Sequence, residues 1–286
     1  MRAIASMGDF LKDLWVAFNE DQVPFLAAAV SYFAFFSLFP LFLGLIAVAG
    51  HVLAPEEASR RLMGFIVQGF PGQEVFLRRI IESVVASRGA VGFFALVTLL
   101  WSGKNLFVSL AQALDLIEKA PAPGGLYFTI KRNLVCLACA VALGGILLLL
   151  GGLYGLLFAV LAFEIPLLGI QPREIPLLMP FVSDVLPVAL VALGLIALYR
   201  WLPAHPRPLG DVIAGAAVAA ALWEVLRRLF TWYVATFGRF NEVYGPATSV
   251  IVFLFWLYLS AIVFLLGGEW AAVRGRRSGG SAAGSS

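Results

Sequence analysis

The segment LWEVLRRLFTWY, residues 222–233, places Glu224, Arg227 and Arg228 near the middle of an apolar stretch that runs from Val212 to Phe237. A bilayer core about 30 Å thick is crossed by roughly 20 helical residues, so this stretch is long enough to span it. Charged side chains at such a depth are costly unless they are paired or hydrated. The segment therefore predicts both a membrane helix and a polar site within that helix.

The whole chain has the composition of a membrane protein. Hydrophobic residues make up 61% of it and charged residues only 13%, against roughly 25% charged residues in soluble domains. Long apolar runs recur along the sequence without the period-2 alternation of a β-barrel, which favours helices. These runs are Phe25–Gly50, Val91–Leu110, Leu134–Phe163, Phe181–Trp201, Leu209–Phe237 and Thr248–Val273. The fold class predicted is an all-α integral membrane protein with six transmembrane helices, in a domain of residues 25–273.

The segments outside the apolar runs predict short helices and a flexible end. Residues 1–24 carry apolar side chains at helical spacing and are expected to form an interfacial helix on the cytoplasmic leaflet. Between the first two runs, the apolar stripe around Ile81 opposes charged residues such as Arg79, which predicts short amphipathic helices. Residues 274–286 end in SGGSAAGSS, which is typical of a disordered tail.

The distribution of basic residues predicts the orientation of the chain. An even number of spans places both termini on one side of the membrane. RGRR at residues 274–277 directly follows the last run, and the side that holds the termini receives more arginine and lysine than the other. By the positive-inside rule, both termini are expected in the cytoplasm of a bacterial cell, with the chain crossing the inner membrane several times.

The charged residues of the opening segment share one face of the expected helix. At 100° per residue, Arg227 and Arg228 each lie within about 60° of Glu224. Small residues fill the same face, whereas bulky apolar residues cover the opposite side. The pattern predicts that the bulky side faces lipid and that the small, charged side faces the protein interior.

Two interpretations of this charged face remain open. In the first, Glu224 forms a buried ion pair with Arg228 that fixes the helix register, while Arg227 reaches a carbonyl group or the membrane surface. In the second, the face lines a substrate path, because two arginines against one carboxylate leave one positive charge suited to an anion. Under the second interpretation Lys104 and Asp115, which share one face of the second span, join the same pathway.

The sequence offers no evident site for a metal or a cofactor. Its two histidines, His51 and His205, lie in different loops and are unsuited to a joint metal site. A GxxxxGK[ST] motif is absent, so a P-loop for ATP is not expected. The net charge of +3 is not collected on a basic face outside the membrane, which argues against nucleic-acid binding. Membrane lipids are the expected partners, with a homo-oligomer or an envelope protein as a further one.

Three signatures resemble the YihY/BrkB family of bacterial inner-membrane proteins, and the resemblance covers the chain from about Phe10 to Val273. The first is LAAAVSYFAFFSLFPLF (residues 26–42), and the second runs from Trp101 to LDLIEK, where the family more often has asparagine in place of Asp115. The third extends from RWLPAHPRPLGDVIAG (residues 200–215) through the opening segment to FLLGGEW (residues 264–270). The residues that match the family pattern are Tyr32, Ser37, Pro40, Asp211, Gly215, Glu224, a basic residue at 227 or 228, Tyr244, Gly245 and Glu269.

The resemblance implies a transporter or a virulence-related membrane protein, and some family members carry the label ribonuclease BN. A nuclease needs a water-accessible cluster of acids, histidines or metal ligands and a basic surface for RNA, which the sequence lacks. We therefore expect no enzymatic activity. The leading expectation is translocation of an anionic amphiphile such as a lipid, and the alternative is a non-transporting scaffold for envelope assembly.

Overall fold

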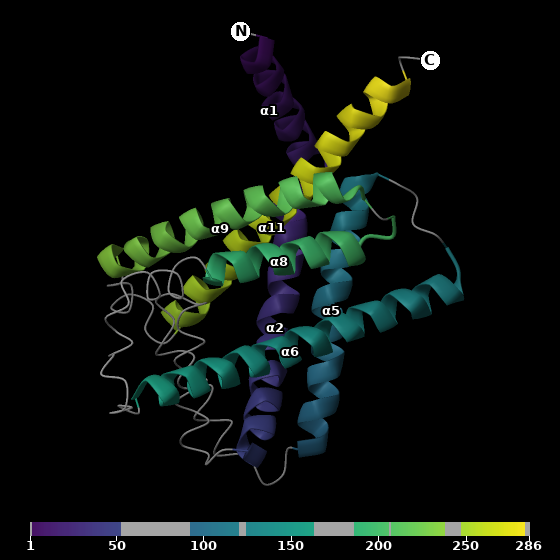
Figure 1. Cartoon of the computed structure of the whole chain (residues 1–286). Coiled ribbons are helices and arrows are strands. Elements are labelled where there is room, and N and C mark those ends of the chain that lie inside the picture. The colour runs from purple at the N-terminus through teal and green to yellow at the C-terminus, as the bar shows by residue number, and fades with distance from the viewer. Residues whose placement is uncertain are drawn as a thin grey trace.

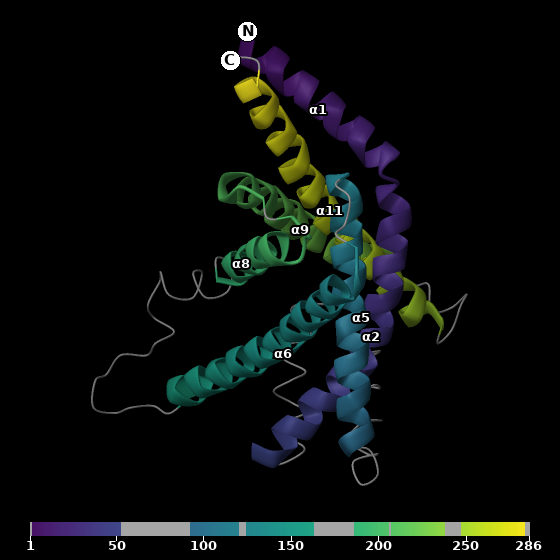
Figure 2. The ribbon, with the colours of Figure 1, turned by 90° about the vertical axis from the view of Figure 1, so that its right-hand side faces the viewer.

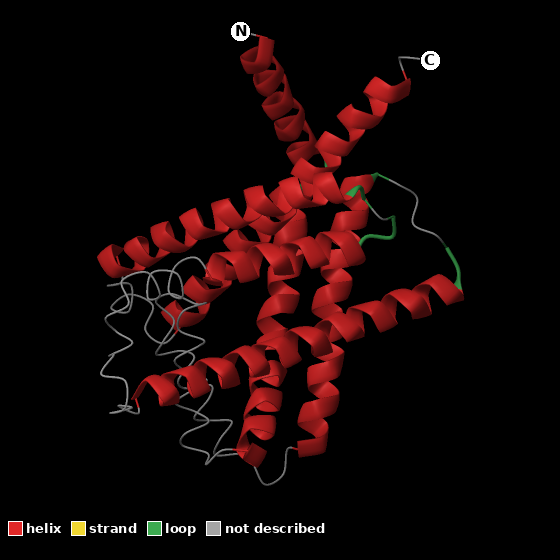
Figure 3. Cartoon of the chain, viewed as in Figure 1, coloured by secondary structure: helices red, strands yellow, loops and turns green. Residues whose placement is uncertain are grey.

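The structure is a computed structural model that describes residues 2–52, 92–119, 124–162, 186–205, 207–237 and 247–283. The regular secondary structure of these residues is helical throughout (Figure 3). The helices are α1 (Arg2–Glu20), α2 (Val23–Val52), α5 (Gly92–Glu118), α6 (Leu126–Ala162), α8 (Leu186–Trp201), α9 (Leu209–Phe237) and α11 (Ala247–Ala283). Each helix from α2 onward overlaps one of the apolar runs, so the all-helical fold is confirmed for the described residues.

Two of the described helices carry segments long and apolar enough to cross a membrane. They are Leu209–Thr236 on α9 and Val250–Ser278 on α11. Shorter apolar helical segments are Val23–Ser37 on α2 and Val188–Trp201 on α8. The number of membrane crossings therefore stays a prediction.

The helices cross one another rather than forming one parallel bundle. Helices α2 and α5 run side by side, and α6 packs across α5 (Figures 1 and 2). Helix α11 crosses α2 and packs along α9, which in turn packs on α8. The described core consequently lies where α11 meets α2, α5 and α9.

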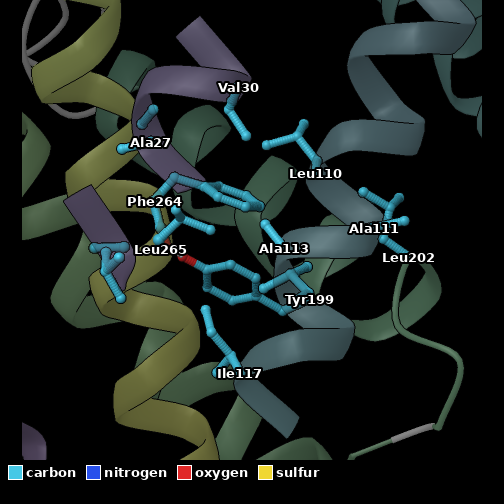
Figure 4. Packing of buried hydrophobic residues seen from close by; sticks show 14 of the residues in the cluster. Ala27, Val30, Leu110, Ala111, Ala113, Ile117, Tyr199, Leu202, Phe264 and Leu265 are labelled. Carbon is cyan, nitrogen blue, oxygen red and sulfur yellow. Dashed lines mark hydrogen bonds between the residues drawn. The ribbon is translucent and has the colours of Figure 1, made fainter. Parts of the chain in front are cut away.

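Tyr199 of α8 lies at the centre of this core. Its side chain is completely buried, and its hydroxyl donates a hydrogen bond of 2.5 Å to the backbone carbonyl of Phe264 on α11. Figure 4 shows the ring surrounded by side chains from α2, α5 and α11, including Val30, Ile117 and Leu265. A buried hydroxyl needs such a partner, so the bond fixes α8 against α11 as well as satisfying the tyrosine.

Glycines let neighbouring helices approach α11 closely. A Cβ atom added at Gly215 of α9 would lie 2.4 Å from the backbone oxygen of Gly267, and one added at Gly267 would lie 2.5 Å from Ala219 Cβ. A Cβ at Gly268 would lie 2.8 Å from Leu114 Cδ2 on α5. Small residues at membrane-helix crossings permit this kind of backbone approach. One short segment of α11 thus packs against both α9 and α5.

Helix α1 packs on the C-terminal part of α11 (Figure 2). Leu14 is buried against Val273, and Asp13 forms an ion pair with Arg277. Trp15 remains 68% exposed on another side of α1. The expected N-terminal helix is therefore present, and part of its apolar face contacts protein; its position at the membrane surface stays a prediction.

Helix α11 continues beyond Val273, where the sequence predicts the start of a disordered tail. It ends at Ala283, and its added turns carry arginines that face acidic groups. Arg274 Nε lies 3.1 Å from Asp211 Oδ1. Arg274 and Arg277 in this extension thus pair with acidic residues of other helices, which the composition of the tail does not reveal.

Some expectations concern residues outside the described ranges. The amphipathic helices between the first two runs fall within residues 53–91, and Tyr244 and Gly245 fall within residues 238–246. Pro40 lies inside α2, which runs through it without interruption. Figure 2 shows that α2 curves along its length, as helices that contain proline commonly do.

Candidate functional site

The charged side chains of α9 form a connected group, which we call the α9 triad (Glu224, Arg227 and Arg228). Arg227 donates from Nε and from Nη2 to the two carboxylate oxygens of Glu224, each at 2.8 Å. Arg228 donates from Nε to Glu224 Oε1 at 2.6 Å. Spacings of three and four residues bring side chains together on a helix surface. The three charges therefore share one side of α9, as the sequence predicts.

The α9 triad is open on one side and lies near the middle of a candidate span. The exposed fraction is 17% for the Glu224 side chain, 34% for Arg227 and 70% for Arg228. Glu224 is about 22 Å of helix rise from Leu209 and about 18 Å from Thr236, the ends of the apolar segment. Two guanidinium groups against one carboxylate leave one net positive charge at this depth, where lipid tails offer no partner.

The inward side of α9 differs from the predicted one. Phe230, expected to face lipid, is 3% exposed, and its ring centroid lies 4.8 Å from that of Trp256 on α11. The buried residues of α9 lie to one side of the charged face; they include Val212, Gly215, Ala216, Ala219 and Phe230. The expected orientation holds only in part. Leu222, Val225 and Leu229 of the predicted lipid side are exposed. The Glu224 side chain is only 17% exposed, but the ridge of Gly215 and Ala219, not the charged face, packs on α11.

Asp115 belongs to a different polar group. Its Oδ1 accepts a hydrogen bond of 2.8 Å from the backbone N–H of Ala204, and its Oδ2 lies 3.4 Å from Arg132 Nη1. Burial raises the pKa of the Asp115 carboxyl, and the hydrogen bond from Ala204 opposes that rise. Asp115 thereby joins the end of α5 to α6 and to the turn after α8.

Lys104 lies about three turns before Asp115 on α5. Its side chain is half-buried and lies within electrostatic range of Cys136 on α6. Within the described residues, neither Lys104 nor Asp115 forms a hydrogen bond or an ion pair with the α9 triad. The pathway that would join these residues therefore stays a prediction.

A second set of charges, which we call the junction cluster, lies where the α1–α2 turn meets α5, α11 and the segment between α8 and α9. Its members are Asp21, Glu118, Lys119, Arg207 and Glu269. Arg207 is 5% exposed, forms an ion pair with Glu118, and donates from Nη1 to the Gly268 carbonyl at 3.1 Å. Lys119 Nζ lies 3.3 Å from Asp21 Oδ1. Ion pairs and hydrogen bonds thus connect helix ends that are distant from one another in the sequence.

Apart from the α9 triad, the described residues of the family pattern occupy two places in the structure. Asp211, Gly215 and Glu269 lie at the crossing of α9 and α11, where Glu269 is completely buried. On α2, Ser37 is buried and donates to the Ala34 carbonyl at 2.8 Å, whereas Tyr32 is 57% exposed. The first group shapes the packing of the core, while the second lies on a separate helix.

Three residues of this region were missed by reasoning from sequence. In the sequence, Tyr199 is part of an apolar run, and Arg207 is one more basic residue on the predicted cytoplasmic side. Asp21 precedes the first run, where an acidic residue is ordinary. Local spacing could not reveal their partners, because Arg207 and Glu118 are 89 residues apart. Gly267 and Gly268, directly before Glu269, are the feature of the sequence that indicates a close contact between helices here.

Metal binding finds no ready site in the described ranges. No group of three or more His, Cys, Asp or Glu side chains is placed there to hold an ion. Several of the charged groups that the structure brings together are mixed acid–base pairs, such as Arg207 with Glu118 and Arg274 with Asp211. Their chemistry is that of ion pairing and anion contact.

Comparison with known proteins identifies similar sequences. The chain matches the family described as Virulence factor BrkB over residues 14–285. A Bacillus subtilis (strain 168) protein, YfkH, described as ribonuclease-like, is 26% identical over 275 residues, which cover 94% of this chain and 96% of that protein. No solved structure matches.

Two further relatives carry the name UPF0761 membrane protein. The one from Chlorobium phaeobacteroides is 25% identical over 264 residues, which cover 91% of this chain and 56% of that protein. The one from Xanthomonas campestris pv. campestris (strain B100) is 25% identical over 275 residues, which cover 95% of this chain and 62% of that protein. The chain thus spans little more than half the length of these two relatives.

Proposed function

The chain belongs to the virulence factor BrkB family of membrane proteins, and on that basis we propose that it translocates an anionic amphiphile such as a phospholipid or a lipid-linked precursor. The observation that carries the proposal is the α9 triad, whose Arg228 side chain is 70% exposed near the middle of a candidate span. A phosphate group would meet this guanidinium while the acyl chains stay in lipid. Helix α9 is then the helix that receives the headgroup.

The charge balance of the α9 triad favours an anion over a cation. Glu224 already accepts hydrogen bonds from both arginines, so its carboxylate is satisfied within the helix. The remaining donor groups of Arg228 point to a partner with acceptor oxygens, because a guanidinium carries five N–H donors and no acceptor. Phosphate accepts such hydrogen bonds in a bidentate manner, and the net charge of the site complements it.

A scaffold that organises envelope assembly is the second candidate function. The bidentate contact between Arg227 and Glu224 favours it, since an ion pair within one helix can serve to fix geometry. In that case a carboxylate of an envelope protein, or of a second copy of the chain, would meet Arg228. The two functions differ in whether lipid moves.

The proposal places the chain in the bacterial inner membrane with both termini in the cytoplasm. Reporter fusions at Gly275 are expected to give a cytoplasmic signal, and fusions near Glu56 an external one. The reason is the basic segment at residues 274–277, which the membrane potential and anionic lipids hold on the inner side. Measurement of paired cytoplasmic and periplasmic reporters at each site checks the orientation, and reversed signals at both sites would contradict it.

Replacement of the whole α9 triad separates binding from folding. The variant Glu224→Leu/Arg227→Met/Arg228→Met should fold, because the carboxylate and both guanidinium groups of the triad are removed together. Its translocation of an anionic fluorescent lipid in liposomes should fall at least about tenfold, since a charge-assisted hydrogen bond contributes about 1.5–3 kcal/mol. The folded fraction is measured by size-exclusion chromatography in detergent.

Val225→Met is the matched control, because Val225 lies on the same helix and is 53% exposed. It should translocate lipid at the wild-type rate. A folded triple variant with an unchanged rate would refute the lipid site. Absence of lipid movement in the wild type, together with loss of a co-purifying envelope protein or of oligomers in the triple variant, would instead support the scaffold.

We also propose that the chain is not an enzyme, although its relative YfkH is described as ribonuclease-like. The charges of the α9 triad, and the contacts of Arg207 with Glu118 and of Lys119 with Asp21, are acid–base pairs, whereas metal-dependent RNA hydrolysis uses grouped acidic or histidine ligands. Incubation of RNA with the purified protein, with and without magnesium, checks this proposal, and specific cleavage would overturn it.

A further inference from the structure

Glu269 is buried without a hydrogen-bond donor for its carboxylate. The residue is completely buried on α11, and neither Oε1 nor Oε2 has a hydrogen-bond partner among the described residues. The guanidinium nearest to it, that of Arg276, is 3.8 Å from Oε2 and is itself 42% exposed. An ionised carboxylate in such a place loses its hydration and gains little in return.

Asp21 faces Glu269 from the turn between α1 and α2. The two carboxyl groups lie within hydrogen-bonding reach of each other, yet Asp21 Oδ2 is also buried without a donor. The side chain of Asp21 is 8% exposed, and its other oxygen lies 3.3 Å from Lys119 Nζ. Two carboxylates that face each other as acceptors repel, whereas one proton between them supplies the missing donor.

The surrounding charges do not remove the need for that donor. Lys119, directly after α5, is 45% exposed and also pairs with Glu20 at 2.9 Å, so its charge is shared between two acids and partly hydrated. Arg276 of α11 donates from Nη1 to the Ile117 carbonyl at 3.2 Å. From the segment between α8 and α9, Arg207 binds the carbonyl of the neighbouring Gly268. None of these groups donates a hydrogen bond to Glu269 within the described residues.

The backbone beside the pair adopts an uncommon conformation at two positions. Gln22, next to Asp21, has φ of 51°, and Lys119 has φ of 54°. Non-glycine residues in the left-handed region are uncommon and strained. Both residues lie in turns that bring a charged side chain to the pair. The fold therefore tolerates strain on two sides of Asp21 and Glu269.

We propose that Asp21 and Glu269 form a proton-binding site, in which one proton from solvent is shared by the two carboxyl groups and holds the α1–α2 turn against α11. The proton forms an O–H bond with one carboxylate and a hydrogen bond to the other, so the pair carries one negative charge instead of two. Such charge-assisted hydrogen bonds are short and strong. The site is separate from the α9 triad and does not depend on lipid translocation.

Infrared difference spectroscopy of the full-length protein in detergent tests the site directly. The wild type at neutral pH should show a carbonyl band of a protonated carboxyl group that shifts in deuterium oxide and disappears as the solution is made alkaline. Glu269→Gln should lose this band, because the amide supplies the donor without a titrating proton. Asp21→Asn should lose it as well, since the new amide can donate to an ionised Glu269.

Two control variants separate this band from other carboxyl groups. Glu20→Gln changes an acid whose side chain is 60% exposed and should keep the band. Asp115→Asn removes another partly buried carboxyl group and should keep it too. Asp21→Asn keeps the test valid if Glu269→Gln fails to fold, because Asp21 lies in a turn.

The proposal would be overturned by a wild type without such a band at neutral pH, or by a band that persists in both Glu269→Gln and Asp21→Asn. Thermal stability that depends on sodium or potassium but not on a large organic cation, in a wild type without the band, would assign the pair to a metal cation and also overturn it.

Discussion

Gly215→Val is expected to remove most of the folded protein from the membrane. A Cβ atom at this position would lie 2.4 Å from the carbonyl oxygen of Gly267 and 2.9 Å from Ala271 Cβ, both of which are fixed by α11. Overpacking in a well-packed core costs about 1–3 kcal/mol, and more where the backbone has to move. Because α9 and α11 would have to separate, we expect a loss of at least about 3 kcal/mol. Detergent-extracted yield and thermal unfolding of the purified protein measure it.

Gly194→Val on α8 is the matched control. A Cβ atom at Gly194 would have nothing within 4 Å, so the extra side chain meets no neighbour. Its yield should stay close to that of the wild type. Gly267→Ala should fall between the two, since its Cβ would lie 2.5 Å from both Ala219 Cβ and the Tyr199 hydroxyl. Similar yields for Gly215→Val and Gly194→Val would mean that the two helices do not cross at Gly215.

Arg207→Met is expected to destabilise the fold by about 3–5 kcal/mol, the usual cost of removing one partner of a buried ion pair. The substitution leaves Glu118 without its guanidinium and takes a donor from the Gly268 carbonyl. Because the Glu118 side chain is 21% exposed, the lower end of that range is expected. Thermal unfolding in detergent, compared with the wild type, measures the loss.

Arg274→Met provides the comparison with a cation that is half-exposed. Arg274 is 54% exposed and pairs at 3.1 Å with Asp211, which is buried, so the loss is expected to be smaller than for the buried Arg207. Arg207→Met combined with Glu118→Leu should recover part of the lost stability, because no uncompensated charge then remains. Equal losses in Arg207→Met and Arg274→Met would show that burial of Arg207 does not matter.

Much of the helical framework could be predicted from the sequence, because hydrophobic length and continuity are local properties. The runs Phe25–Gly50 and Leu209–Phe237 lie within α2 and α9, whose observed bounds are within a few residues. The end of α11 could not be predicted in this way. The helix continues past Val273, where Arg274 pairs with Asp211 and Arg277 pairs with Asp13. Such partners come from other helices, so composition alone does not show them.

The candidate site could be predicted only in part, because helical spacing is local whereas contacts between helices are not. The contact of Glu224 with Arg227 and Arg228 follows from helical spacing, and the structure has it. The direction in which α9 turns its charges does not follow from spacing. The orientation of α9 depends on which of its sides packs on α11, and the side that includes Gly215 makes this contact. Asp21 and Glu269 likewise meet only through the folded arrangement of α1, α2 and α11.

The position of α11 has a consequence for the synthesis of the protein. This helix contacts α1, α2, α5 and α9, yet it is the last of the described helices to leave the ribosome. Translation at about 5–20 residues per second separates the end of α2 from the start of α11 by roughly 10–40 s. During that interval Asp21 and the α2 residues that pack on α11 have no α11 to meet, and Arg207 and the glycine ridge of α9 are made only shortly before α11. The core of the nascent chain therefore stays incomplete until α11 is made. During this time insertion chaperones and membrane proteases compete to bind the chain.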